Sequence, residues 1–159
     1  MSESPKHWMP REHWDAMVRG EDCPLCAEVA STQPDNEFGL KIADLNFSRL
    51  RLARNQYVKG YCVLICHKHV REPYELTANE RTTFFEDMCR VGVALECAFG
   101  ADKMNFEILG NAVPHLHAHI KPRYYGDSAP SRPIWVDAQT VTLTADEYAA
   151  RIALIKQHL

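Results

Sequence analysis

Three histidines, His115, His117 and His119, alternate with apolar residues within the segment from Asn111 to Arg123. In a β-strand, side chains two residues apart point to the same face, so these imidazoles are expected to form one row. Such a row suits two kinds of chemistry: coordination of a metal ion by neutral imidazoles, or attack on phosphorus by one histidine nitrogen that its neighbours orient. The alternative is a row on a solvated strand face with no ligand.

Residues next to the row suit an anionic ligand. Lys121 and Arg123 supply positive charge, and the turn at Gly110 and Asn111 can present backbone N–H groups to phosphate oxygens. Taken alone, the two cations fit a solvated strand end as well.

A second cluster of reactive residues is found at Cys23 and Cys26, which have the Cys-x-x-Cys spacing with which two thiolates bind one zinc ion. A thioredoxin-like redox pair opens a helix within a βαβ unit, whereas this pair follows an expected helix and has no such context. The alternative is two free thiols. Cys62, Cys89 and Cys97 lie among apolar residues and are expected to be small buried hydrophobes.

The elements that must position these residues are expected to form an α+β fold with a mainly antiparallel sheet. Thr77 and Glu80 form a capping-box signature, and apolar residues recur at helical spacing from there to Gly100, which predicts one long helix. In a strand expected over residues 47–53, Arg49 and Arg51 are expected on a solvated face. Further strands are expected over 61–66, 104–109 and 113–122, and short helices over 11–19 and 144–158.

The composition fits one globular domain over residues 1–159, with 46% hydrophobic and 25% charged residues. The formal net charge of −3, from 18 basic and 21 acidic residues, disfavours a nucleic-acid polymer as partner. No apolar run approaches the roughly 18 residues of a membrane span, and the first residues lack the hydrophobic core of a secretion signal. We therefore expect a cytoplasmic protein with no membrane partner.

The segment His115-Leu-His117-Ala-His119-Ile resembles the motif of the histidine-triad (HIT) family, in which three histidines alternate with apolar residues. The Lys-Pro-Arg that follows matches the way in which many members continue. Upstream, the segment from Gly60 to Val70 resembles the Gly-His-hydrophobic-Pro-Lys-x-His segment of the family.

The resemblance covers about residues 20–125 and leaves a C-terminal extension over 126–159. It implies a HIT-like fold: a mainly antiparallel sheet of about five strands, packed with one long helix and short terminal helices. Within the matched part, Cys66 stands where the family usually has proline.

The resemblance also implies a nucleotide hydrolase or nucleotidyl transferase that acts at the α-phosphate of a nucleoside phosphate. His117 corresponds to the middle histidine, which attacks phosphorus and forms a nucleotidyl-histidine intermediate. His119 is implied to contact the same phosphate and to assist the leaving group, and His115 to fix the site from the other side. The implied substrates are dinucleoside polyphosphates, nucleoside phosphoramidates and other adenylylated compounds. Members are often two-fold dimers, so a homodimer is expected.

Nucleotide contacts follow from the same resemblance. Besides His117 and His119, the implied residues are Asn55, near the end of a strand where members hold the ribose, Asn111, four residues before the first histidine, and Asn105. The connection after Asn55 is shorter than is usual in the family. Turn formation and exposed strand polarity are alternative explanations for these asparagines.

Some histidine-triad proteins carry a structural zinc ion, and the resemblance places Cys23, Cys26, His69 and His115 at its ligand positions. Two thiolates and two imidazoles make a closed four-coordinate site, which is typical of structural rather than catalytic zinc. Such an ion would tie the N-terminal segment to the triad strand. The sequence leaves His67 open as an alternative to His69.

Two other functions stay open at the level of the sequence. A non-catalytic protein of the same fold would bind a purine nucleotide as a sensor or scaffold. A metalloprotein would use the His-x-His-x-His row itself as its metal site. Metal removal discriminates here, because loss of turnover without unfolding favours a catalytic metal, and unfolding favours a structural one.

Overall fold

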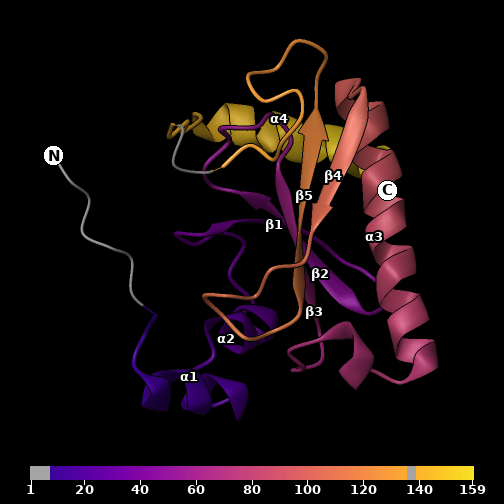
Figure 1. Cartoon of the computed structure of the whole chain (residues 1–159). Helices are drawn as coiled ribbons and strands as arrows, with labels where there is room; N and C mark the ends of the chain where they lie inside the picture. The colour runs from indigo at the N-terminus through magenta and orange to yellow at the C-terminus, as the bar shows by residue number, and fades with distance from the viewer. Residues whose placement is uncertain (1–7, 136–138) are drawn as a thin grey trace, which may run out of the picture.

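The computed structural model describes residues 8–135 and 139–159 (Figure 1). The strands form one five-stranded antiparallel sheet in the order β1-β2-β3-β5-β4, which confirms the expected α+β class. The strands are β1 (Gly39–Asp44), β2 (Ser48–Ala53), β3 (Cys62–Cys66), β4 (Lys103–Glu107) and β5 (His117–Arg123). The helices are α1 (Arg11–Val18), α2 (Pro24–Ala30), the short 3-10 helix η1 (Pro73–Glu75), α3 (Ala78–Phe99) and α4 (Ala145–Lys156).

The hydrophobic core lies between one face of the sheet and the helices α3 and α4. Strand residues such as Leu50, Leu64 and Ala118 face this core, together with Phe84 from α3 and Tyr148 from α4. Figure 1 shows α3 running alongside β4, and α4 crossing behind the strands. Because side chains alternate along a strand, the odd-numbered residues of the central strands point to the opposite face of the sheet.

The long helix α3 begins and ends where the sequence predicts. Thr77 Oγ1 accepts a hydrogen bond from the backbone N–H of Glu80 at 3.3 Å, and the Glu80 carboxylate accepts from the N–H of Thr77 at 2.9 Å. Gly100 ends the helix with a φ of 65°, in the left-handed region that glycine favours. A Cβ at Gly92 would lie 2.7 Å from the ring of Phe106, so this glycine lets β4 pack closely on the helix.

The expectation of a solvated face on β2 is wrong. Arg49 and Arg51 are only 6% and 3% exposed. Arg49 donates to the backbone oxygens of Glu28 and Ser31 at 2.5 and 2.8 Å, and Arg51 pairs with the Glu28 carboxylate and donates to the oxygen of Gly39. Both arginines are buried because α2, a helix that the sequence pattern does not predict, covers this part of the sheet.

Other differences concern strand ends and two cysteines. β5 begins at His117 rather than at residue 113, because the chain before it bends. Cys62 is buried as expected, but Cys89 and Cys97 are exposed. The apolar side of α3 faces the sheet, and these two thiols lie on its other side, so burial was the wrong prediction for them.

The C-terminal extension contributes to the same core. α4 begins at a capping box of Thr144 and Glu147, and its residues Tyr148 and Ile155 are buried against α3 and β1. The extension therefore packs on the sheet that carries the histidines.

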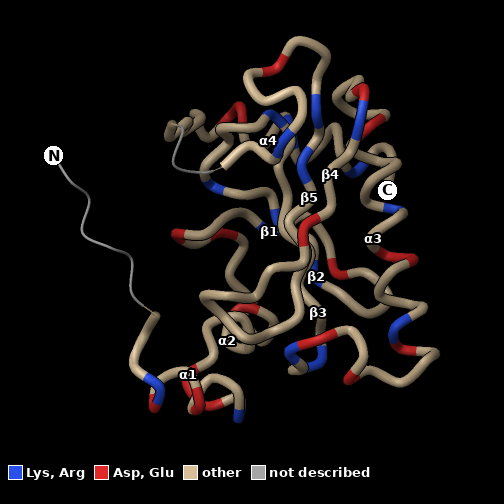
Figure 2. The backbone as a smooth tube through the Cα atoms, viewed as in Figure 1, with Lys and Arg blue, Asp and Glu red and all other residues tan. Residues whose placement is uncertain are grey.

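Charge is spread along the chain. In Figure 2, Lys and Arg residues are interspersed with Asp and Glu residues in the part of the backbone that is described. Among the described helices, none has the length and apolar character that a membrane span needs.

Candidate functional site

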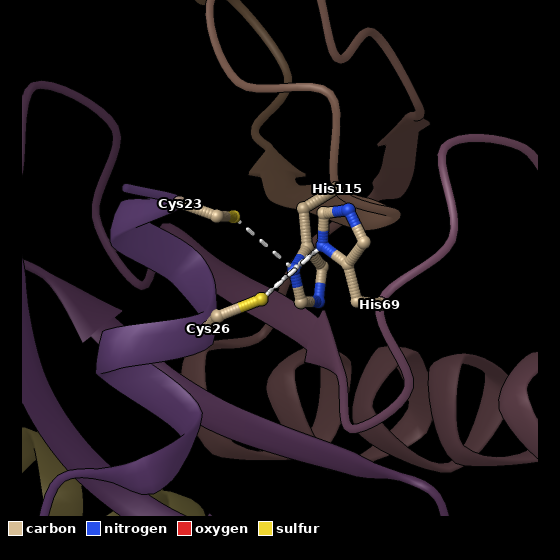
Figure 3. A group of neighbouring side chains, drawn as sticks. All are labelled: Cys23, Cys26, His69 and His115. Carbon is tan, nitrogen blue, oxygen red and sulfur yellow. Dashed lines mark hydrogen bonds between the residues drawn. The ribbon is translucent and has the colours of Figure 1, made fainter. Parts of the chain in front are cut away.

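Four potential metal ligands meet near the start of α2, the end of β3 and the start of β5, and their ligand atoms all lie within 4.8 Å of one another (Figure 3). Cys26 Sγ is 3.2 Å from His69 Nδ1 and 3.5 Å from His115 Nδ1. Cys23 Sγ is 3.6 Å from His115 Nδ1, and the two Nδ1 atoms are 3.2 Å apart. These are the four residues that the resemblance implies as zinc ligands.

The donor set of this cluster fits a metal ion. His69 Nε2 lies 3.0 Å from the backbone oxygen of Val18, and His115 Nε2 lies 2.8 Å from that of Cys66. A carbonyl oxygen only accepts, so each neutral ring carries its hydrogen on Nε2 and keeps a lone pair on Nδ1, toward the cluster. Burial also lowers the pKa of His115 to about 4, which favours the neutral form that metal binding needs.

The local structure explains how the ligands come together. Cys23 caps α2 and Cys26 lies in its first turn, whereas His69 follows β3 and His115 precedes β5. A metal ion held by all four would join α2 to the two central strands. His67, the alternative ligand, instead has its Nε2 3.7 Å from Asp44 Oδ1 and is outside the cluster.

The predicted row of three histidines is broken at its first member. His115 precedes the strand, and its ring points toward the other three potential metal ligands. His117 and His119 lie on the same face of β5, with ring centroids 5.0 Å apart. The chain bends at His115, so the strict alternation expected for a strand holds only from His117 onward.

His117 is the more buried ring of the pair. Its Nδ1 lies 2.6 Å from the backbone oxygen of His115, so the neutral ring carries its hydrogen there and has a lone pair on Nε2. The residue is 9% exposed. Burial lowers the pKa of His117, which keeps the ring neutral and nucleophilic at neutral pH.

His119 contacts a residue that the sequence interpretation passed over. Its Nδ1 lies 2.6 Å from the hydroxyl oxygen of Tyr61. Burial, followed by the nearby positive charge of protonated His117 and of Lys121, lowers the pKa of His119 to about 4. Tyr61 comes close to His119 because β3, which begins directly after Tyr61, is adjacent and antiparallel to β5. A sequence pattern does not reveal which strands pair, so this contact was not predicted.

The two cations after the row are already paired with acidic residues. Lys121 Nζ lies 2.8 Å from a carboxylate oxygen of Glu107 and is buried. Arg123 makes two hydrogen bonds to Asp127, at 2.6 and 2.8 Å, and donates to Asn105 Oδ1 at 2.8 Å. These cations therefore hold the segment after β5 and do not offer free positive charge for a phosphate, contrary to the expectation from sequence.

The three asparagines lie in different places. The Asn55 amide accepts from the N–H of Val141 at 2.8 Å and lies 3.4 Å from the oxygen of Gln139, so it fastens the C-terminal segment. Asn105 accepts from Arg123, on the wall of a cavity of about 1090 Å³ that runs along β4. Asn111 is exposed in the loop before the histidines. Their nucleotide contacts stay a prediction.

Comparison with known proteins places this arrangement in a family. The sequence model described as the HIT domain matches residues 40–126. The protein hit of Bacillus subtilis (strain 168) is 27% identical in an alignment of 114 positions that covers 65% of this chain and 72% of that protein.

Solved structures agree with the sequence match. The crystal structure of a histidine triad (HIT) protein from Sinorhizobium meliloti 1021 has a TM-score of 0.72 and 27% identity, covering 77% of this chain and 90% of that one. A Zn-bound histidine triad family protein from Mycobacterium smegmatis has the same fold, with a TM-score of 0.63, 20% identity, and coverage of 86% and 94%. The sheet, the long helix and the histidine motif thus agree with the family match, and the chain belongs to the HIT domain family.

Proposed function

We propose that this protein is a nucleotide hydrolase or nucleotidyl transferase that acts at the α-phosphate of a nucleoside phosphate, with His117 as the nucleophile. The observation that carries this proposal is the 2.6 Å contact between His117 Nδ1 and the backbone oxygen of His115. This contact leaves the Nε2 lone pair of a neutral imidazole free to attack. Membership of the HIT domain family supports the nucleotide as the ligand.

The proposed reaction has two balanced steps. First, His117 Nε2 forms a bond to phosphorus while the bond from phosphorus to the leaving group breaks, and the leaving group departs with the electron pair and takes a proton from solvent. His119 donates a hydrogen bond where negative charge develops. Second, water attacks phosphorus, the N–P electron pair returns to Nε2, and one proton of the water goes to solvent. In a transferase, another hydroxyl or amine replaces the water.

We also propose that Cys23, Cys26, His69 and His115 hold a structural zinc ion. Two thiolates and two oriented imidazoles are a donor set that zinc prefers, and a closed set of four leaves no position for substrate. The histidine triad protein from Mycobacterium smegmatis is described as Zn-bound, which supports the choice of metal. Zinc in this site would supply rigidity around His115, whose backbone oxygen contacts the nucleophile.

The space for the leaving group is proposed to lie toward β4. Glu107 lies opposite His119 in the register of β4 and β5, and it lines the cavity of about 1090 Å³ together with Asn105. His119 does not itself line this cavity, and we propose that the leaving group occupies the end of the cavity at Glu107. Asn111 lies in the loop before the histidines, and we propose that it contacts the phosphate from there.

A cytoplasmic homodimer is part of the proposal. β4 is an edge strand of the sheet, and its Phe106 is exposed, so a second copy would cover unpaired backbone groups and apolar surface there. Light scattering on the purified full chain tests this, since a monomer mass at all concentrations would contradict it.

The test of the function compares the wild type with His117→Ala and with the control His13→Ala, which changes an exposed histidine of α1. Each protein is incubated with a dinucleoside polyphosphate and with an adenosine phosphoramidate, and AMP release is followed. We expect His117→Ala to lose roughly 10³-fold or more of the turnover, and rapid quench to show one added nucleotidyl group on His117 of the wild type. Tight nucleotide binding without turnover by the wild type would refute the enzyme and favour a sensor.

A further inference from the structure

We infer that Tyr61 is a positioning residue for the proposed reaction: its hydroxyl binds Nδ1 of His119 and so makes that ring present an Nε2–H group to the phosphate. The inference rests on the proposed function and adds to it a residue outside the three histidines. Tyr61 acts through His119, and no contact of Tyr61 with substrate is required.

The direction of the hydrogen bond follows from the partners that are available. Tyr61 Oη and His119 Nδ1 are 2.6 Å apart, and both side chains are half-buried. Within residues 8–135 and 139–159, Nδ1 is the one group placed at hydrogen-bonding distance from this hydroxyl. If His119 donated, the hydroxyl hydrogen would lose that partner, which is unfavourable in a partly buried position. Burial also raises the pKa of Tyr61, so the hydroxyl keeps its proton and donates it.

Several contacts fix the Tyr61 ring. Lys121 Nζ lies 5.4 Å from its centroid, and the ring of Tyr57 packs edge-on at 5.5 Å. Lys121 is in turn held by Glu107 at 2.8 Å. Gln56 Nε2 donates to the backbone oxygen of Tyr61 at 2.9 Å. A ring held in this way keeps its hydroxyl at a fixed point, so the hydrogen bond selects one tautomer of the imidazole that it meets.

The two neighbouring imidazoles consequently have opposite tautomers. His117 carries its hydrogen on Nδ1 and a lone pair on Nε2, and His119 carries its hydrogen on Nε2. One ring is therefore ready to attack phosphorus, while the other is ready to donate to the oxygen or leaving atom on which charge develops. With the other tautomer, His119 would aim a lone pair at an anionic phosphate.

The experiment removes one oxygen atom. Tyr61→Phe deletes the hydroxyl and keeps the ring over Lys121. The matched control is Tyr57→Phe, which deletes the hydroxyl of the adjacent ring, a hydroxyl with no hydrogen bond to the described residues. Zinc-loaded proteins are compared by long-range ¹H–¹⁵N NMR of the histidine rings without nucleotide, and then by kcat and KM for AMP release from the better of the two adenosine substrates.

In the wild type and in Tyr57→Phe, we expect the His119 hydrogen on Nε2. In Tyr61→Phe, we expect a mixture of tautomers, with kcat lowered by about tenfold and KM changed less than twofold, because preorganisation and not ground-state binding is lost. An unchanged tautomer in Tyr61→Phe would overturn the inference, whatever happens to kcat. An unchanged kcat in an active protein would overturn it too. A tautomer change in a wild type that has no turnover would support the role of Tyr61 and refute the proposed function, so the two failures are distinguishable.

Discussion

The backbone oxygen of His115 lies 2.6 Å from Nδ1 of His117, so a residue of the group of four potential metal ligands also orients the proposed nucleophile. The side chain of His115 faces Cys26 and His69, while its carbonyl group faces the neighbouring imidazole. Any change that moves the backbone of His115 therefore also moves the carbonyl oxygen that contacts Nδ1 of His117.

The first prediction concerns loss of the metal. We expect Cys26→Ser to lower both the melting temperature and the turnover, because it opens the cluster that holds His115. Structural zinc in small peptides contributes about 10–16 kcal/mol. Even a loss of about 4 kcal/mol would lower the melting temperature by roughly 8–16 °C in a chain of this size. Calorimetry and zinc analysis measure both effects.

Cys97→Ser is the control for that experiment, since Cys97 is an exposed thiol on α3. We expect it to keep its zinc and its melting temperature. Equal melting temperatures for Cys26→Ser and the wild type, with the metal absent from the variant, would contradict a structural role.

The second prediction concerns stability and pH. Burial, then the charges of protonated His117 and of Lys121, lowers the pKa of His119 from 6.5 to about 4. Between these values the unfolded chain binds a proton that the folded chain does not, so the free energy of unfolding decreases as the pH falls from 6.5 toward 4. We expect His119→Gln to lose less stability than the wild type between pH 7 and pH 5, as measured by urea unfolding. Parallel losses in the two proteins would argue against the lowered pKa.

The third prediction concerns the buried ion pair between Glu28 and Arg51, whose side chains are 5% and 3% exposed. Glu28→Gln leaves the guanidinium buried without its counter-charge, and breaking such a pair typically costs about 3–5 kcal/mol. Asp15→Asn is the control, because its partner Arg11 is 83% exposed and such surface pairs contribute about 0–1 kcal/mol. Chemical denaturation gives both values, and a similar small loss in the two variants would show that α2 does not depend on the pair.

The fourth prediction separates two roles of Asn55. Its amide accepts from Val141 and lies within reach of the oxygen of Gln139, so we expect Asn55→Ala to lower the free energy of unfolding by about 1–2 kcal/mol. If these hydrogen bonds are the whole role of the amide, KM for the nucleotide stays within about twofold of the wild-type value. Steady-state kinetics together with urea unfolding measure both quantities. A tenfold rise in KM with unchanged stability would instead favour the ribose contact.

Much of the fold could be predicted because its signals are local. The capping residue Thr77 and the terminating Gly100 mark α3 through backbone hydrogen bonding and a left-handed φ, which act within a few residues. The helix α2 has a weaker local signal: Pro24 lies at its start, but the helix is only 7 residues long and Cys23 caps it without a side-chain hydrogen bond. The burial of Arg49 could not be predicted for the same reason, because it depends on α2 lying across β2.

The candidate site shows the same limit. His117 and His119 share a face because strand geometry is periodic, and that part follows from spacing alone. His115 leaves the row because the chain bends before β5, and the partners of Lys121 and Arg123 come from a neighbouring strand and a later loop. Such pairings depend on tertiary contacts, which a linear pattern does not contain.

The sequence distance between Cys23 and His115, 92 residues, has a consequence for the order of folding. During synthesis, the two cysteines emerge long before the second histidine ligand, and thiolate pairs alone make an incomplete tetrahedral site. The fourth ligand arrives only when the chain before β5 reaches the end of β3. A zinc ion in the proposed site would therefore gain its fourth ligand only once the chain has been synthesised as far as the start of β5, and it would then close a loop of this length.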